Sequence, residues 1–223
     1  MEQKVLDNRF IDIRAGGVTL AGNLSVPRSA RGLVLFVHGS GSSRMSPRNQ
    51  TVARSLQRAG LATLLFDLLT SGEELIDSET QSMRFDIPML AQRTVAAMNW
   101  MGLLDSTASL HIGLFGASTG AAAALAAAAA RPELVYAVVS RGGRPDLAEA
   151  SLQGVRAPVL LIVGGQDREV LELNRSAIDR LDPQVESRLE VVPQATHLFE
   201  EPGALDQVAD LASQWFVDHL PGE

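Results

Sequence analysis

The sequence predicts an α/β protein with a mostly parallel sheet of about eight strands and helices on both faces. Short apolar runs, as expected of strands buried on both sides, alternate with segments of helical spacing from residue 32 onward. Glycine-rich or polar residues follow the end of most of these runs. Because strand–helix–strand crossovers in one sheet are right-handed, this alternation favours a parallel sheet covered by helices on both faces.

The composition fits one globular domain over residues 1–223. A chain of 223 residues, with 46% hydrophobic and 20% charged residues, is long enough to bury a substantial core. Its net charge of −7 disfavours nucleic-acid binding as the main function. It has no cysteine, which excludes disulfides, thiolate metal sites and a cysteine nucleophile, and is compatible with the cytoplasmic location that we expect.

Neither a signal peptide nor a membrane span is expected. The start, "MEQKVLDNRF", mixes charged and apolar residues and has no apolar core of the signal-peptide kind. From Ser106 to Ala130 the only titratable side chain is His111, and the length alone would suggest a span. Alanine is only weakly apolar, however, and glycines interrupt the middle. A strand, a tight turn and a buried helix explain the stretch better.

The first half of the chain predicts a hairpin, two buried strands and two helices. "RFIDIRAGGVTLAGNLSVP" (9–27) predicts two antiparallel strands joined at Gly16-Gly17. Buried strands are expected at "GLVLFV" (32–37) and "LATLLF" (61–66), with a helix in "NQTVARSLQRAG" (49–60) between them. "LLTSGEELIDSETQS" (68–82) has the composition of a loop. The next helix begins by Pro88, since proline fits a first helical turn.

The second half repeats the alternation of strand and helix. The expected strands are "HIGLF" (111–115), "VYAVVS" (135–140), "PVLLIV" (158–163) and "SRLEVV" (187–192). The expected helices are "TGAAAALAAAAA" (119–130), "PDLAEASLQG" (145–154), "VLELNRSAIDRL" (170–181) and "ALDQVADLASQWFVDHL" (204–220).

The residues that follow these strands carry the chemistry, because ligands of open parallel sheets bind outside the carboxyl ends of the strands. The pattern Gly116-Ala117-Ser118-Thr119-Gly120 matches G-x-S-x-G, a sharp strand-to-helix turn that presents a nucleophilic serine. Asp167 and His197 follow later strands. One edge of the sheet therefore gathers a serine, an acid and a histidine.

These three residue types form a known catalytic arrangement. A serine hydroxyl is a poor nucleophile near neutral pH, but His197 can take its proton, and Asp167 can orient and stabilise the imidazolium. Two N–H groups are needed for the oxyanion. We expect one from Thr119, directly after the nucleophile, and the other from Ser40 in the "HGSG" turn, with Gly39 as the second choice.

The motifs "HGSG", "GASTG", "GGQD" and "ATH" resemble the α/β-hydrolase superfamily, in which the triad follows the order Ser, Asp, His. The compact size and the spacing from "GGQD" to "ATH" look most like the dienelactone hydrolase-related branch. The resemblance implies a triad of Ser118, Asp167 and His197. We expect no cofactor, and the mechanism of such a triad needs no metal. Dienelactone hydrolases use a cysteine nucleophile, whereas this sequence has serine, which favours hydrolysis of general carboxylic esters through an acyl-serine intermediate.

Several alternatives stay open. Asp146 is the rival acid, because some superfamily members place theirs after the preceding strand, and Asp167 could instead cap a helix. His38 is expected to be structural. A Rossmann reading fails because Arg44 stands at the third position of G-x-G-x-x-G. A catalytically degenerate hydrolase that acts as a binding module, and a dienelactone or lactone hydrolase, are the alternative functions.

Substrate recognition is the least defined part of the expectation. Only a short segment separates Ser140 from Pro158, so a large cap domain is not expected, and residues 68–84 are the best candidate for a partial cover. The partner is a small-molecule ester, and the protein is a monomer or a homodimer. Arginines near the predicted edge either bind an anionic group of the substrate or form a solvated rim. They are Arg44, Arg48, Arg84, Arg141 and Arg144.

Overall fold

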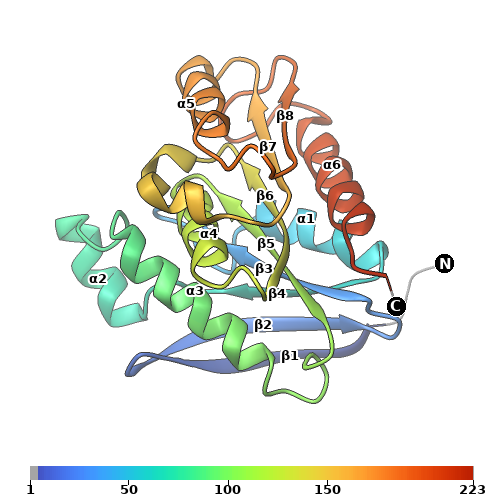
Figure 1. Ribbon diagram of the computed structural model, residues 1–223. Coiled ribbons are helices and arrows are strands. Elements are labelled where there is room, and N and C mark those ends of the chain that lie inside the picture. The colour runs from blue at the N-terminus through green and yellow to red at the C-terminus, as the bar shows by residue number, and fades with distance from the viewer. Residues whose placement is uncertain (1–4, 223) are drawn as a thin grey trace.

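A single eight-stranded sheet runs through the molecule, and the computed structural model describes residues 5–222 (Figure 1). The strand order is β1-β2-β4-β3-β5-β6-β7-β8. The strands are β1 (Val5–Ala15), β2 (Val18–Pro27), β3 (Gly32–Val37), β4 (Leu61–Phe66), β5 (His111–Ala117), β6 (Val135–Arg141), β7 (Val159–Gly164) and β8 (Ser187–Val192). The pairs β1–β2 and β2–β4 are antiparallel, and the later pairs are parallel, which confirms the predicted fold class.

Helices cover both faces of the sheet (Figure 1). One hydrophobic cluster joins the sheet to α1 (Pro47–Arg58) and α6 (Ala204–Asp218). A second cluster, on the opposite face, joins it to α3 (Ile87–Met101), α4 (Thr119–Ala130) and α5 (Arg168–Ile178). A 3₁₀ segment, η1 (Pro145–Gly154), packs against α4 and takes the place of the short helix expected there. Among residues 5–222, no helix is both long and apolar enough to cross a membrane.

The alanine-rich helix α4 lies very close to the sheet. Most of its residues are buried, and its small side chains allow the short distance. A Cβ at Gly120 would collide with the backbone carbonyls of Val37 and His38 at the end of β3. The loop after β3 and the start of α4 can therefore meet only because residue 120 has no side chain.

The loop predicted at residues 68–82 is wrong, because most of it is the helix α2 (Ser71–Thr80). The helix begins with a capping box, in which Thr70 accepts the N–H of Glu73 and the Glu73 carboxylate accepts the N–H of Thr70. Arg93 of α3 donates to that carboxylate at 2.5 and 2.8 Å, and also to the Leu68 carbonyl. Apolar periodicity does not indicate this helix, because Asp77 is its one buried residue and it has no apolar stripe.

Candidate functional site

Ser118 occupies the turn between β5 and α4 in a strained conformation. Its φ is 51° and its ψ is −126°, a combination that residues other than glycine rarely adopt. The turn is held by the backbone: the Ser118 N–H donates to the Arg141 carbonyl at 3.2 Å, and the Ser118 carbonyl accepts from the Arg144 N–H at 3.0 Å. The Ser118 side chain makes no capping hydrogen bond to α4, so helix capping does not use its hydroxyl.

The glycine-rich turn after β3 lies directly against this serine. A Cβ built on Gly39 would lie 2.8 Å from the Ser118 Cβ and 2.9 Å from the Ala117 carbonyl oxygen. Real Cβ atoms do not approach other atoms so closely, so residue 39 has to be glycine for this contact. The "HGSG" turn and the "GASTG" turn, which are about 80 residues apart in sequence, therefore form one continuous surface at the sheet edge.

Asp167 and His197 form a short hydrogen bond on the other side of Ser118. The His197 Nδ1 lies 2.6 Å from the Asp167 Oδ2, and the carboxylate is largely buried while the ring is 38% exposed. Asp167 occupies the N-cap position of α5, but its side chain makes no capping hydrogen bond. The expected alternative, a helix cap, therefore does not describe this carboxylate.

The rival acid, Asp146, is used elsewhere. Arg144 donates two hydrogen bonds to its carboxylate, at 2.9 and 2.8 Å, in the parallel arrangement that arginine makes with carboxylates. The side-chain partner of His197 is therefore Asp167, after β7, and not Asp146, after β6.

The backbone places His197 near Ser118. A Cβ on Gly142, the residue after β6, would lie 3.6 Å from the His197 Cε1 and 3.0 Å from its carbonyl oxygen. Its neighbour Arg141 is the residue whose carbonyl binds the Ser118 N–H. Within residues 5–222, the structure has no direct hydrogen bond between the Ser118 hydroxyl and the His197 ring. Such bonds are often loose before substrate is bound.

Ser40 and Thr119, the expected oxyanion donors, are bonded to each other. The Ser40 N–H donates to the Thr119 Oγ1 at 2.9 Å, and the two hydroxyl oxygens are also 2.9 Å apart. Thr119 is the first residue of α4, and the first N–H groups of a helix have no intrahelical partner. The Thr119 N–H is thus suited to bind an anion, whereas the Ser40 N–H already has an acceptor.

His38 is structural, as expected. Its Nε2 accepts the Leu68 N–H at 3.0 Å, so the ring proton is on Nδ1, which donates to the Gly39 carbonyl at 3.0 Å. Burial lowers the pKa of His38, which keeps the ring neutral. The ring therefore links the loop after β3 to the loop after β4.

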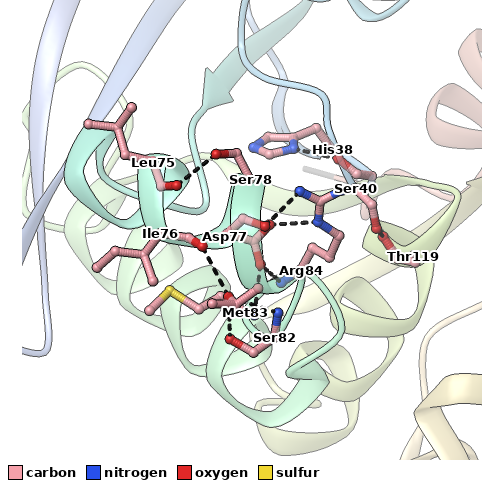
Figure 2. A network of polar contacts seen from close by, with 12 residues as sticks. His38, Ser40, Leu75, Ile76, Asp77, Ser78, Ser82, Met83, Arg84 and Thr119 are labelled. Carbon is pink, nitrogen blue, oxygen red and sulfur yellow. Dashed lines mark hydrogen bonds and ion pairs between the residues drawn. The ribbon is translucent and has the colours of Figure 1, made fainter.

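A cavity of about 550 Å³ adjoins the Ser40–Thr119 contact. One wall runs from His38 to Arg48, through the loop after β3 and the first turn of α1, and the opposite wall is α2 with the residues that follow it. Figure 2 shows Asp77 and Arg84 of that wall in the same view as His38, Ser40 and Thr119. The sequence predicts a partial cover from this segment, but not the α2 residues that line the cavity, Glu74, Asp77 and Ser78. The capping-box pattern at Thr70 was the signal that could have revealed them.

The arginines expected near the substrate have different surroundings. Arg44 is ion-paired with Asp67, Arg84 with Asp77 at 2.6 Å, and Arg144 with Asp146 at 2.8 Å. Arg141 is only 7% exposed, and its Nε and Nη1 have no hydrogen-bond partner among the described residues. Burial is the main cause that lowers the pKa of Arg141 to about 10, and Arg48 adds to it.

No group of three or more histidine and acidic side chains within residues 5–222 is arranged to hold a metal ion. The acids nearest the site are already engaged, because Asp67 and Asp77 each bind an arginine and Asp167 binds His197.

Known proteins of similar sequence and structure share this architecture. A solved structure of a dienelactone hydrolase from Anabaena variabilis is 56% identical, with a TM-score of 0.93 over 96% of this chain and 99% of that chain. Est1E from Butyrivibrio proteoclasticus is only 16% identical and shares the fold, with a TM-score of 0.78 over 94% of this chain and 98% of that one.

Two curated relatives are longer than this chain. They are proteins from two Mycobacterium tuberculosis strains that carry the provisional name phosphoribosyl transferase, and each is 56% identical over 97% of this chain. The chain spans about half of their length, 48%. The model of the dienelactone hydrolase family matches residues 20–216. This chain therefore belongs to the dienelactone hydrolase family, a family of hydrolases with the α/β-hydrolase fold.

Proposed function

We propose that the protein hydrolyses carboxylic esters through an acyl-enzyme intermediate on Ser118. The observation that carries the proposal is the 2.6 Å hydrogen bond between Asp167 and His197, beside a serine held in a strained strand-to-helix turn. Strain of that kind is retained where it serves a function. The acid, the base and the nucleophile come from three separate loops at one edge of the sheet.

In the acylation step, His197 acts as the general base. Its Nε2 takes the proton of the Ser118 hydroxyl as the oxygen attacks the ester carbonyl carbon. Throughout this step, the Nδ1–H of His197 donates its hydrogen bond to the Asp167 carboxylate. The tetrahedral intermediate collapses when the bond to the leaving alkoxide breaks, and the His197 imidazolium returns the proton to that oxygen. The products of this step are the free alcohol and acyl-Ser118.

In the deacylation step the same groups act on water. His197 takes a proton from a water molecule as its oxygen attacks the acyl carbon, and then returns the proton to the Ser118 oxygen as the acyl–oxygen bond breaks. The carboxylic acid leaves, and the serine hydroxyl is restored. The sequence of steps needs no redox partner.

Both tetrahedral intermediates carry a negative oxygen that two N–H groups would stabilise. The Thr119 N–H and the positive end of the α4 dipole suit this task. The Ser40 N–H can contribute only if the oxyanion replaces the Thr119 hydroxyl as its acceptor, because the two are 2.9 Å apart and bonded. Substrate binding and a rotation of the Thr119 side chain would then be coupled.

The substrate would be a small ester or one with an exposed acyl group. After β6 the chain has only the ten-residue η1 segment before β7, which leaves the site without a large lid on that side. The cavity between the His38–Arg48 loop and α2 can hold a short chain. A lactone is a second candidate, because it is a cyclic ester, takes the same steps, and the 56% identical solved structure is described as a dienelactone hydrolase.

A fluorophosphonate, which reacts covalently with activated serines, tests the proposal. We expect stoichiometric labelling that mass spectrometry assigns to Ser118, and turnover of p-nitrophenyl acetate or butyrate by the same preparation. Ser118→Ala should remove the label and leave only about 10³–10⁴ of rate enhancement over water. A folded protein that neither reacts nor turns over any ester or lactone would instead be a degenerate hydrolase that acts as a binding module, and labelling at another serine would refute the assignment.

A further inference from the structure

Arg141 is the last residue of β6, and its side chain points away from α4. The preceding residue, Ser140, faces α4, because a Cβ on Gly143 would collide with the Ser140 Oγ and with the Ala121 Cβ. Side chains alternate along a strand, so Arg141 projects to the opposite face, the one that α1 and α6 cover. Its register partner in β7, Ile162, belongs to the hydrophobic cluster of that same face.

The guanidinium of Arg141 is buried, and no counter-charge from residues 5–222 binds it. Its Nε and Nη1 have no hydrogen-bond partner among the described residues, although the residue is only 7% exposed. The one charged group that shifts its pKa is another cation, Arg48. Burial and that neighbour lower the pKa of Arg141 only to about 10, so the group stays protonated at neutral pH.

Arg48 is itself only weakly neutralised. Its Nη1 lies 3.4 Å from Glu200, whose side chain is 66% exposed, and its buried Nε finds no partner in the part of the chain that the structure describes. Arg48 lies in the first turn of α1, which contains no acidic residue. The positive end of this helix dipole therefore adds to the field of the two arginines.

Such an arrangement is unfavourable for the protein by itself. A buried ion without a partner costs free energy, and a second like charge nearby adds to that cost. The other arginines near the site show the contrast, since Arg44, Arg84 and Arg144 each bind an aspartate. An anion with two or three oxygens would supply the acceptors that Arg141 lacks.

This cationic pair lies beside the proposed reaction centre. The Arg141 carbonyl accepts the Ser118 N–H at 3.2 Å, and its neighbour Gly142 lies against the His197 ring. Arg48 lines the cavity that also contains Ser40 and Thr119. The cavity lining includes Arg48 but not Arg141, so a terminal anion on an acyl or alcohol group would approach Arg141 past Arg48 while its ester carbonyl lies at Ser118.

We propose that Arg141 and Arg48 form a subsite for an oxyanion, a carboxylate or a phosphate, on the substrate of this enzyme. The proposal rests on the proposed ester hydrolysis at Ser118 and names the substrate class of that site. Arg141 makes the buried contact. Arg48 sits at the rim of the subsite, where the anion displaces Glu200 from it.

Anion binding is measured first, because it does not depend on catalysis. Sodium phosphate or sodium butyrate, at an ionic strength matched with sodium chloride, should raise the Tm of the unmodified protein and give a Kd by titration. Arg141→Met and Arg48→Gln should each weaken that Kd at least tenfold. The matched control is Arg54→Gln on the exposed face of α1, where the arginine donates to the Thr51 hydroxyl, and it should keep the Kd of the unmodified protein.

The same variants separate a binding arginine from a structural one. Arg141→Met removes a buried, unpartnered cation, so its Tm without added anion should not fall. A lower Tm in Arg141→Met together with an unchanged Kd in Arg48→Gln would overturn the proposal. Failure of both phosphate and butyrate to raise the Tm of the unmodified protein would also overturn it. Whichever anion gives the larger shift identifies the phosphate or the carboxylate class.

Kinetics then place the subsite on the substrate. We expect monomethyl glutarate, or the corresponding phosphate-bearing methyl ester, to have a higher kcat/KM than neutral methyl butyrate. Arg141→Met should lower the ratio of anionic to neutral kcat/KM at least tenfold, equivalent to about 1.4 kcal/mol, and Arg141→Lys should restore part of it. Equal losses on both esters would show a structural arginine. If no ester is turned over while the anion-dependent Tm shift persists, the proposed hydrolysis fails and the anion site stands.

Discussion

The two sides of the candidate site treat their charges differently. On the side formed by α2 and the start of α3, residues 68–93, the arginines are neutralised locally: Arg84 binds Asp77 and Arg93 binds Glu73. On the side formed by the loops after β6, β7 and β8, Arg144 also binds a local acid, Asp146, but Asp167 holds His197, and the buried Arg141 binds no carboxylate among the described residues.

This difference distinguishes ion pairs that stabilise the fold from charged groups that remain available for catalysis or substrate binding. Glu73 and Arg93 anchor a helix that contributes little to the hydrophobic core, so the ion pair replaces the apolar face that α2 lacks. Asp167 lies at the N-cap position of α5 but does not cap that helix, and its carboxylate binds His197 instead. Substitutions on the first side should therefore lower the stability of the protein, and substitutions on the second side should lower its activity.

The largest expected effect is on the activity side and compares two acids. Asp167→Asn should lower kcat for an activated ester by about 10⁴, because the amide favours the wrong tautomer of His197. Asp146→Asn should leave kcat within a few-fold, since that carboxylate binds Arg144. Steady-state kinetics of both variants, with circular dichroism to check the fold, provide the measurement. A larger loss in Asp146→Asn would reverse the assignment of the acid.

The next effect is on the stability side. Arg93→Met should lower the free energy of unfolding by about 3 kcal/mol, because it leaves the Glu73 carboxylate and the Leu68 carbonyl without their shared, largely buried donor. Urea denaturation provides the measurement. The control is Arg131→Met, which breaks the exposed pair with Glu133 and should cost about 0–1 kcal/mol. Similar values for the two variants would mean that Arg93 does not anchor α2.

A smaller effect tests the contact between the two glycine-rich turns. Gly39→Ala places a Cβ 2.8 Å from that of Ser118, so the turn must shift, and kcat/KM should fall about tenfold to a hundredfold. The comparison variant is Gly72→Ala in α2, where a Cβ meets nothing within 4 Å. That change should leave kcat/KM unaltered and stabilise the helix by about 0.5–1 kcal/mol. Unchanged activity in Gly39→Ala would show that the turns are not closely coupled.

The smallest expected effect is a loss of stability as the pH falls below about 5. The side-chain hydrogen bonds from Arg93 lower the pKa of Glu73 to about 2 from its ordinary value of 4.5. Since the folded-state pKa is depressed, the stabilisation is fully present above about 4.5 and is lost as the pH falls toward 2. The Tm of Glu73→Gln should thus vary less between pH 5 and pH 2 than that of the unmodified protein. Parallel pH curves for the two proteins would contradict the role given to this pair.

The sequence by itself determined most of the sheet and the positions of the polar residues on it. The runs 32–37 and 61–66 are β3 and β4 with the predicted bounds, because strands buried on both faces leave an uninterrupted apolar pattern. The run 187–192 is β8, also with the predicted bounds, although this edge strand is only partly buried. Parallel strands place their carboxyl ends at one edge, so the sequence also indicated that Ser118, Asp167 and His197 share that edge.

Only the tertiary structure decided which charged groups meet. It paired Asp167 rather than Asp146 with His197 and gave Arg44, Arg84 and Arg144 an aspartate each. It left Arg141 buried with no carboxylate partner among residues 5–222. It also made α2 a helix, through a contact between Glu73 and Arg93 that local apolar periodicity cannot report. The physical reason is the same in each case. The apolar pattern of a strand or helix can be read from the local sequence. An ion pair depends on the distance between two side-chain ends, and the conformations of several separate loops set that distance together.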